Sequence, residues 1–446
     1  MSIPAKSDLT PLRTLVASPG FTAALTLAIV GSALSVNLIR STMGWGGLLG
    51  ILCTAVVLSA GSLIALRHDL DWHGVLPISL LAYIGWCAVT IVWSNYQASS
   101  ITGVLYQLIF AFLAVYVALV RDLIQIVRAV GDVLRVLLTA SLALEIMSGL
   151  LLDLPIAFLR IEGNLASAGP LQGLFGSRNM LGFIALIALV TFFIERSMRS
   201  LPTGLSLYSI VLSLVLLIGS RSPISMGIAV VVLVAALAML ALRRARPELR
   251  RALQVGMLTI LVVGTITAYF LRTRILAVIG ARSEFNYRLE IWSQLNDLID
   301  YNQLEGWGWV GLWRPSVSPF FALDFVGNRS HTSALNSFID VYFQLGLIGL
   351  AIFIGMVGLA FVRSWILATS RKSVTYLWPA LILVVLIVTS TTESVLLAEY
   401  GWFLFVMCLV KAAHSLSWRQ GLAMAPPRGN IPPMPQTSTD RPRPAS

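Results

Sequence analysis

The chain has 446 residues, of which 57% are hydrophobic and 11% are charged, and its mean hydropathy is +0.85. About a quarter of the residues of a soluble globular protein are charged, so this composition excludes an ordinary soluble fold and indicates an integral membrane protein. The formal net charge of +11 is what a nucleic-acid-binding protein carries, but the placement of the basic residues, described below, argues against nucleic acid as a partner.

Apolar runs long enough to cross a bilayer recur along most of the chain. A helix needs about 20 such residues to cross the hydrocarbon core. The runs lie at residues 20–39, 44–66, 74–93, 101–120, 133–152, 179–195, 204–219, 222–242, 252–271, 336–362, 374–390 and 394–413. The sequence therefore predicts an all-α, polytopic protein with about twelve transmembrane helices. The short runs 204–219 and 374–390 can instead be tilted or re-entrant segments.

The basic residues predict an orientation. If the N-terminus is cytoplasmic, most of the 31 Lys and Arg residues fall on the inner side, including the basic run at residues 243–251, as the positive-inside rule requires. The sequence thus predicts a protein of the inner (plasma) membrane with both termini in the cytoplasm. Residues 1–19 form the N-terminal segment, 20–413 the transmembrane catalytic domain, and 414–446 a Pro-rich basic tail predicted to be disordered.

Two long segments then lie on the outer side, at residues 153–177 and 272–335. The second connects the ninth and tenth spans and is the large extracytoplasmic loop. Within it, apolar residues recur at helical spacing. They are Phe285, Leu289, Trp292, Leu295 and Ile299. This pattern predicts an amphipathic helix that lies on the outer face of the membrane.

Arg221 is the first candidate functional residue. It lies in GSRSP at residues 219–223, in a short turn at the outer junction of two spans. A guanidinium at the membrane boundary is costly unless it is paired or hydrated, so such residues often serve function. The alternative is a snorkelling arginine that only fixes the turn.

Two further arginines, Arg282 and Arg288, lie in GARSEFNYRLEIW at residues 280–292. Together with Arg221 they can form a cradle for a pyrophosphate, because guanidinium groups bind phosphates bidentately. The alternative for Arg288 is a helix-surface ion pair with Glu284, four residues earlier.

His331 is the only histidine on the predicted outer side. An imidazole is the natural general base near neutral pH, and Asp340 is a candidate partner for it. The alternative is a histidine that is merely solvated on a loop. None of the three cysteines, at positions 53, 87 and 408, has a metal-binding spacing.

The order of several short motifs resembles the O-antigen ligase and O-antigen polymerase superfamily, over roughly residues 80–400. In chain order these motifs are WSNYQAS at 93–99, FGSRNMLG at 175–182, GSRSP at 219–223, RLEIW at 288–292, GWGW at 306–309, HTSALN at 331–336 and QLGLIGL at 344–350. Each motif is weakly specific by itself, and their order and spacing carry the resemblance.

The resemblance implies a glycosyltransferase C-like fold and a reaction at the outer face of the membrane. A glycan would move from undecaprenyl pyrophosphate to a hydroxyl of an acceptor, without a metal, a cofactor or a nucleotide sugar. The acceptor of a ligase would be a lipid core, a wall polymer or a protein. The acceptor of a polymerase would be another lipid-linked glycan. The sequence does not distinguish the two.

The resemblance also implies roles for particular residues. Arg221 and Arg288 match the arginines that hold the pyrophosphate, and His331 matches the histidine that deprotonates the acceptor. Asn179 and Gly182 match the start of a helix in the family. Arg178 departs from the apolar residue or proline that is usual at its position.

Two other classes of membrane protein are less consistent with the chain. In the commonest twelve-helix secondary transporters the long loop is cytoplasmic and lies between spans six and seven. Here that connection is only residues 196–203, and no repeat symmetry is visible. A polyprenyl-monophosphate sugar transferase usually carries acidic residues in its first outer loop, and residues 40–43 contain none.

Overall fold

The computed structural model describes residues 10–68, 70, 76–278, 282–323 and 332–415. A helix coincides with each predicted span, and this described part of the chain contains no β-strand. These helices are α2 (Pro19–Leu34), α3 (Val36–Leu66), α4 (Ile78–Val89), α5 (Gln97–Val120), α6 (Leu123–Ile146), α7 (Arg178–Ser197), α8 (Thr203–Gly219), α9 (Pro223–Arg244), α10 (Pro247–Phe270), α14 (Ser337–Ser370), α15 (Leu377–Thr389) and α16 (Glu399–Ser415). The all-α prediction is confirmed.

Several of these helices are long and apolar enough to cross a membrane. Among the described residues there are 6 of them: α3, α5, α6 with its continuation to Leu152, α7, α9 and α14. Four shorter apolar helices are Pro19–Leu34, Ile78–Val92, Thr203–Gly219 and Val374–Thr389. The chain is therefore a multi-pass membrane protein, and twelve crossings stay a prediction.

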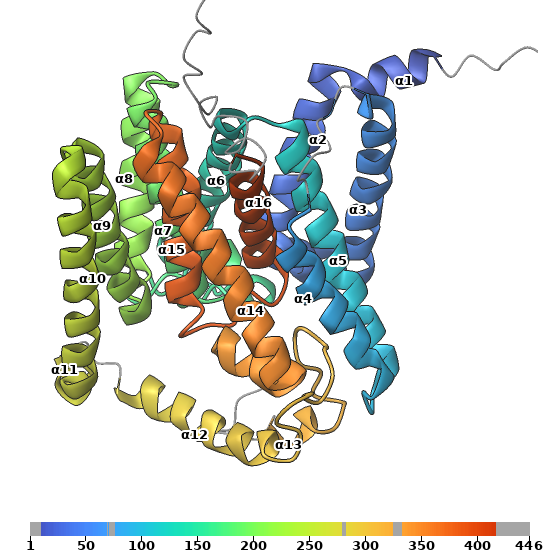
Figure 1. Ribbon diagram of the computed structural model, residues 1–446, viewed down its shortest axis with the longest axis vertical. Helices are drawn as coiled ribbons and strands as arrows, with labels where there is room; N and C mark the ends of the chain where they lie inside the picture. Colours follow the sequence, from blue (N-terminus) through green and yellow to red (C-terminus); the bar gives the residue numbers. More distant parts are fainter. Residues whose placement is uncertain (1–9, 69, 71–75, 279–281, 324–331, 416–446) are drawn as a thin grey trace, which may run out of the picture.

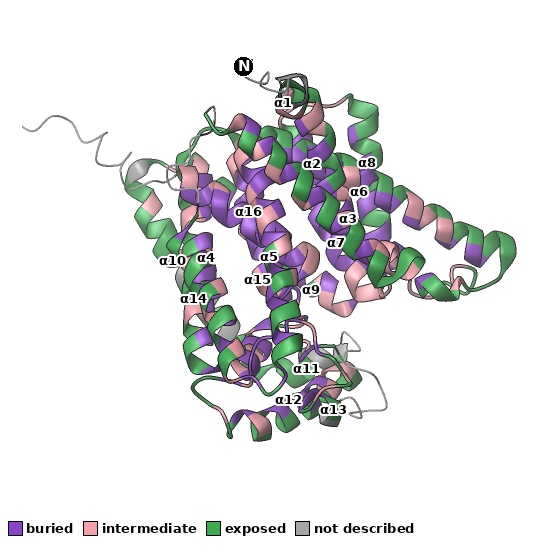
Figure 2. Cartoon of the chain, turned by 90° about the vertical axis from the view of Figure 1, so that its right-hand side faces the viewer, coloured by how far each residue is buried: buried purple, intermediate pink, exposed green. Residues whose placement is uncertain are grey.

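Helices α7, α15 and α16 form the centre of the bundle, where Figure 2 shows buried residues concentrated. Every residue from position 402 to 409 in α16 has 0% of its surface exposed. A helix that is apolar on all sides is stable only when other helices surround it. Helices α9 and α10, in contrast, stand together at the edge of the bundle (Figure 1).

The two ends of the bundle differ in their components. Helix α12 (Arg282–Ile299) crosses one end, near the short α13 (Phe320–Leu323), whereas α1 (Thr10–Ala17) lies at the other end (Figure 1). Arg243 also lies at the α1 end, where its guanidinium donates to the carbonyl oxygens of Ala368 at 2.7 Å and Ser373 at 3.3 Å. The predicted inner basic run and the predicted outer loop are thus at opposite ends of the molecule.

The segment before α14 docks against a kink in that helix. The kink is at Gly346, with φ +67°, and it faces Gly306, with φ +70°. The amide of Trp307 donates to the carbonyl oxygen of Phe343 at 3.1 Å, and the amide of Gly308 donates to that of Gln344 at 2.8 Å. The GWGW and QLG motifs therefore form one joint, which anchors the loop to the bundle.

Helix α12 confirms the predicted helix, and part of its apolar face packs against the protein. Ile291, Leu295 and Ile299 are buried as one stripe, and the fourth residue of this stripe is Arg288. Leu289, which the apolar pattern placed on the membrane-facing side, is 45% exposed. The stripe packs beside Tyr96, Trp313 and Phe343 of the protein itself. The predicted contact of this helix with the membrane surface stays a prediction.

Candidate functional site

The first turn of α7 supplies two of the predicted site residues, Arg178 and Asn179. The Ser177 hydroxyl caps this helix by accepting from the amide of Met180 at 3.2 Å. The Asn179 side chain then joins two distant segments. Its Oδ1 accepts from the hydroxyl of Ser222 at 2.8 Å, and its Nδ2 donates to Oε1 of Glu393 at 3.0 Å.

The starts of helices α7 and α9 lie close together. A side chain at Gly182 would overlap the hydroxyl groups of Ser220 and Ser225. The Ser225 hydroxyl also donates to the backbone carbonyl of Asn179 at 3.4 Å. The Asn and Gly of the FGSRNMLG motif thus share one structural role, which is to bring the starts of α7 and α9 together.

Arg288 is buried, with 6% of its surface exposed. Its Nη2 donates to Oε1 of Glu393 at 3.0 Å, and its Nε donates to the carbonyl oxygen of Thr392 at 3.2 Å. Its Nη1 lies 3.9 Å from Oε2 of Glu284, which is ion-pair distance but beyond a hydrogen bond. The predicted Glu284–Arg288 pair therefore exists, but Glu393 is the closer partner.

Glu284 also pairs with Arg178, so it links α12 to the start of α7. We call the connected side chains of Arg178, Asn179, Glu284, Arg288 and Glu393 the arginine–glutamate network. Burial raises the pKa of the Glu393 carboxyl above its ordinary value, while Arg288 and the hydrogen bond from Asn179 act in the opposite direction.

Arg221 lies beside this network, because its neighbour Ser222 is hydrogen-bonded to Asn179. It occupies the turn between α8 and α9 with φ +46°, a backbone region that non-glycine residues rarely adopt. Its side chain is exposed and makes no hydrogen bond or ion pair with the residues that the structure describes. The guanidinium is therefore available for an external ligand.

The remaining predicted residues lie at the edge of the network or beyond it. Arg282 donates to the carbonyl oxygen of Thr273 at 3.3 Å, at the junction of α12 with α11 (Arg272–Val278), and the structure does not join it to the other arginines. His331 lies outside the described residues. Asp340 is buried and accepts from the amide of Ala334 at 2.8 Å and from the Ser394 hydroxyl. Its predicted contact with His331 stays a prediction.

Sequence reasoning missed Glu393. It lies in STTES at residues 390–394, between the last two apolar runs, and it is the only acidic residue of that connection. A lone carboxylate among hydroxyl residues at a membrane boundary is a sequence feature that marks a candidate functional residue. The turn is tied to the HTSALN segment, because Ser394 accepts from the amide of Asn336 at 3.0 Å and the carbonyl of Thr391 accepts from the Asn336 side chain at 3.1 Å.

The charges of this region favour an anionic ligand. Among the described residues, Arg178 and Arg288 pair with two carboxylates, those of Glu284 and Glu393, and Arg221 pairs with none. The unpaired guanidinium of Arg221 and the Nη1 edge of Arg288 can donate to phosphate oxygens. No cluster of metal-ligating side chains is found among the described residues.

A comparison with known proteins finds a family match for part of the chain. Residues 208–354 match the O-antigen ligase family, a stretch of about a third of the chain that contains Arg221, Arg282, Arg288, His331 and Asp340. No curated protein matches the chain. The family match implies a glycosyltransferase-like enzyme that acts in polysaccharide assembly at a membrane. Residues 208–354 of the chain are therefore similar to the O-antigen ligase family.

Proposed function

We propose that the protein transfers a glycan from undecaprenyl pyrophosphate to the hydroxyl of a glycan, lipid or wall acceptor at the outer face of the membrane. One observation carries this proposal. Arg178, Arg221 and Arg288, from three separate parts of the chain, gather at the same end of the bundle and leave an unpaired guanidinium there. Such a cationic site suits the pyrophosphate of a lipid-linked donor.

The donor pyrophosphate would accept hydrogen bonds from Arg221, Arg178 and the Nη1 edge of Arg288. Glu393 would hold Arg288 in place from the opposite edge of its guanidinium. Undecaprenyl pyrophosphate is a good leaving group, so catalysis requires charge stabilisation and positioning more than bond activation. Because arginines neutralise the developing charge, the proposed reaction needs no metal ion.

In the transfer step, the acceptor oxygen bonds to the anomeric carbon as the bond from that carbon to the pyrophosphate oxygen breaks. The bonding electrons leave with the pyrophosphate, and the proton of the acceptor hydroxyl passes to His331 as general base. Attack from the face opposite the leaving group inverts the anomeric configuration. The same step serves a ligase and a polymerase, which differ only in the acceptor.

Charge-conserving substitutions test the proposed cradle. A lysine keeps the charge but lacks the planar fork, so Arg221→Lys and Arg288→Lys should each reduce transfer from a purified undecaprenyl-pyrophosphate glycan by about tenfold or more. Arg272→Lys and Arg314→Lys are matched controls in the same predicted outer segment and should remain close to wild type. Wild-type transfer and donor binding in both test variants would contradict the cradle. Transfer should also persist in EDTA.

A gene deletion distinguishes a ligase from a polymerase. Loss of a polymerase leaves single glycan units on the cell surface. Loss of a ligase leaves full-length chains on the lipid carrier. Sizing the surface glycans and the lipid-linked glycans of the same cells separates the two outcomes, and unchanged glycans in both fractions would contradict either activity.

A further inference from the structure

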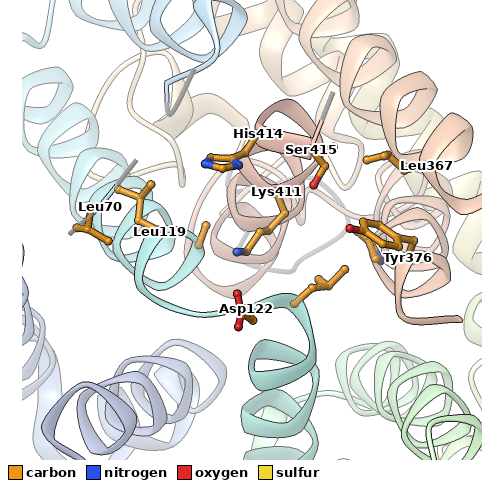
Figure 3. A pocket seen from close by; sticks show the side chains of 12 residues that line it. Leu70, Leu119, Asp122, Leu367, Tyr376, Lys411, His414 and Ser415 are labelled. Atoms are coloured by element: carbon orange, nitrogen blue, oxygen red, sulfur yellow. The ribbon is translucent and has the colours of Figure 1, made fainter. Parts of the chain in front are cut away.

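A second polar site lies at the end of the bundle opposite the arginine–glutamate network. It is a cavity of about 340 Å³ between the ends of α5, α14 and α16 and the starts of α6 and α15. Figure 3 shows its polar side chains, Asp122, Tyr376, Lys411 and His414, together with apolar ones such as Leu119 and Leu367. We call it the Lys411 cavity. Its volume is at the lower end of the range for small-molecule sites.

Two opposite charges face each other across this cavity without forming a direct ion pair. Figure 3 shows the ammonium of Lys411 pointing toward the carboxylate of Asp122. Asp122 caps α6, since its side chain accepts from the backbone amide three residues later, but it forms no ion pair with Lys411 or with any other described residue. Lys411 likewise makes no hydrogen bond or ion pair in the described part of the chain. Lys411 is partly buried and Asp122 is exposed at the edge of the cavity. A partly buried charge without a close partner is costly, so a ligand that brings an anion to Lys411 and a cation to Asp122 would be stabilised here.

We propose that the Lys411 cavity binds the head group of a phospholipid that carries both a phosphate and a primary amine. The phosphate would lie against Lys411, on the wall that also carries His414, and the ammonium would lie against Asp122. The leucines of the wall, Leu119 and Leu367, would contact the glycerol and the first acyl carbons. A site among membrane helices is in reach of lipid, which favours a lipid over a soluble phosphate ester.

The negative charge of Asp122 makes the proposal specific. Basic pockets between transmembrane helices generally favour anionic lipids. Here the carboxylate would attract the ammonium of an ethanolamine head group, which a phosphoglycerol head group lacks. The site should therefore prefer a phosphoethanolamine lipid to a phosphoglycerol lipid. This inference does not depend on the proposed glycan transfer.

Native mass spectrometry of the full-length protein in detergent tests the proposal, with phosphatidylethanolamine and phosphatidylglycerol added in turn. The wild type should retain one molecule of phosphatidylethanolamine more strongly than phosphatidylglycerol. Lys411→Gln should weaken that binding by about ten- to a hundredfold, as expected when a charged hydrogen bond is lost. Lys372→Gln is a matched control, because Lys372 is exposed near the same end of the bundle.

Asp122→Asn provides the sharper comparison, because asparagine caps a helix as well as aspartate does and the fold should persist. This variant should bind both lipids about equally, because the attraction of the carboxylate for the amine, which distinguishes the two lipids, is removed. Equal binding of the two lipids by the wild type would overturn the proposal. Full competition by soluble phosphoethanolamine at the same concentration as the lipid would also overturn it, since the ligand would then not be a membrane lipid.

Discussion

At the scale of single residues, the burial of Arg288 defines the candidate site. An arginine with 6% exposure is stable only if its donors are satisfied. Glu393 and the carbonyl of Thr392 satisfy two of them, which leaves the Nη1 edge beside Glu284 for a ligand. The Arg221 guanidinium, in contrast, is exposed and held on a strained turn. The two arginines therefore contribute differently, one as a fixed donor and the other as an accessible one.

Glu393 should act as a positioning residue. Glu393→Gln keeps an oxygen acceptor for Asn179 but removes the closest countercharge of Arg288. We expect kcat for transfer to fall by about tenfold or more, because the fixed guanidinium loses its orientation, while the melting temperature changes little. Glu393→Asp should recover part of the loss.

Glu290→Gln is the control for Glu393, because Glu290 is an exposed glutamate on α12. Kinetics with the lipid-linked donor, together with a melting curve for each variant, separate positioning from folding. If kcat stays at the wild-type value in Glu393→Gln while the protein melts several degrees lower, Glu393 has a structural role only.

His331 is proposed as the general base, and its removal should lower the rate of transfer without weakening the binding of the donor. In His331→Ala we expect donor binding and protein level near wild type, with transfer reduced by about 10²–10⁴. The measurement is a donor-binding titration beside a transfer assay. Activity within a few-fold of wild type would leave His331 as a solvated loop residue.

At the scale of elements, the joint between Gly306 and Gly346 holds the loop that carries the candidate site residues in a fixed position against the bundle. Both glycines have positive φ, and a side chain at Gly346 would overlap the carbonyl oxygen of Leu304. The Gln344 side chain adds to the joint, because its Oε1 accepts from the amides of Val310 at 2.8 Å and Gly311 at 3.0 Å. Motifs that first suggested a family relationship therefore have a packing role.

Gly346→Ala should break this joint. The substitution forces an unfavourable backbone conformation, worth about 1–3 kcal/mol, and adds the overlap with Leu304. We expect a clear drop in melting temperature in detergent, together with loss of transfer. Gly355→Ala in the same helix is the control, because no atom lies within 4 Å of the added carbon. Equal melting temperatures for the two variants would show that the joint does not stabilise the fold.

The sequence predicted the positions of the helices better than it predicted which buried polar side chains pair with one another. Apolar runs placed a helix in each expected span, because burial in lipid requires long hydrophobic segments. The burial of Arg288 in α12 was not predicted, and Glu393 was missed. Both omissions have the same origin. A polar residue that is buried by pairing with a segment far along the chain looks, in the sequence, like any exposed residue.

At the scale of the whole molecule, the two polar sites lie at opposite ends of one bundle. The arginine–glutamate network lies where α12 crosses the bundle, and the Lys411 cavity lies at the end that also carries Arg243 (Figure 1). Successive long helices run in opposite directions, so their connections lie alternately at the two ends of the bundle, and each site is formed at one of these ends. The proposed reaction requires that the α12 end faces outward, and the basic run near Arg243 supports that orientation through the positive-inside rule.

Cysteine labelling tests this orientation directly. Cys53 is exposed, whereas Cys87 and Cys408 are buried, so Cys53→Ala gives a background in which an added thiol dominates the signal. Glu290→Cys lies on α12, and Glu248→Cys lies at the start of α10, and both positions are exposed. In intact cells, with the outer membrane made permeable where one is present, a maleimide that cannot cross the plasma membrane should label position 290. Position 248 should react only after the cells are lysed. The reverse pattern would place the arginines on the cytoplasmic side, where they could not receive a donor at the outer face, and labelling of both positions in intact cells would contradict a bundle whose ends lie on opposite sides of the membrane.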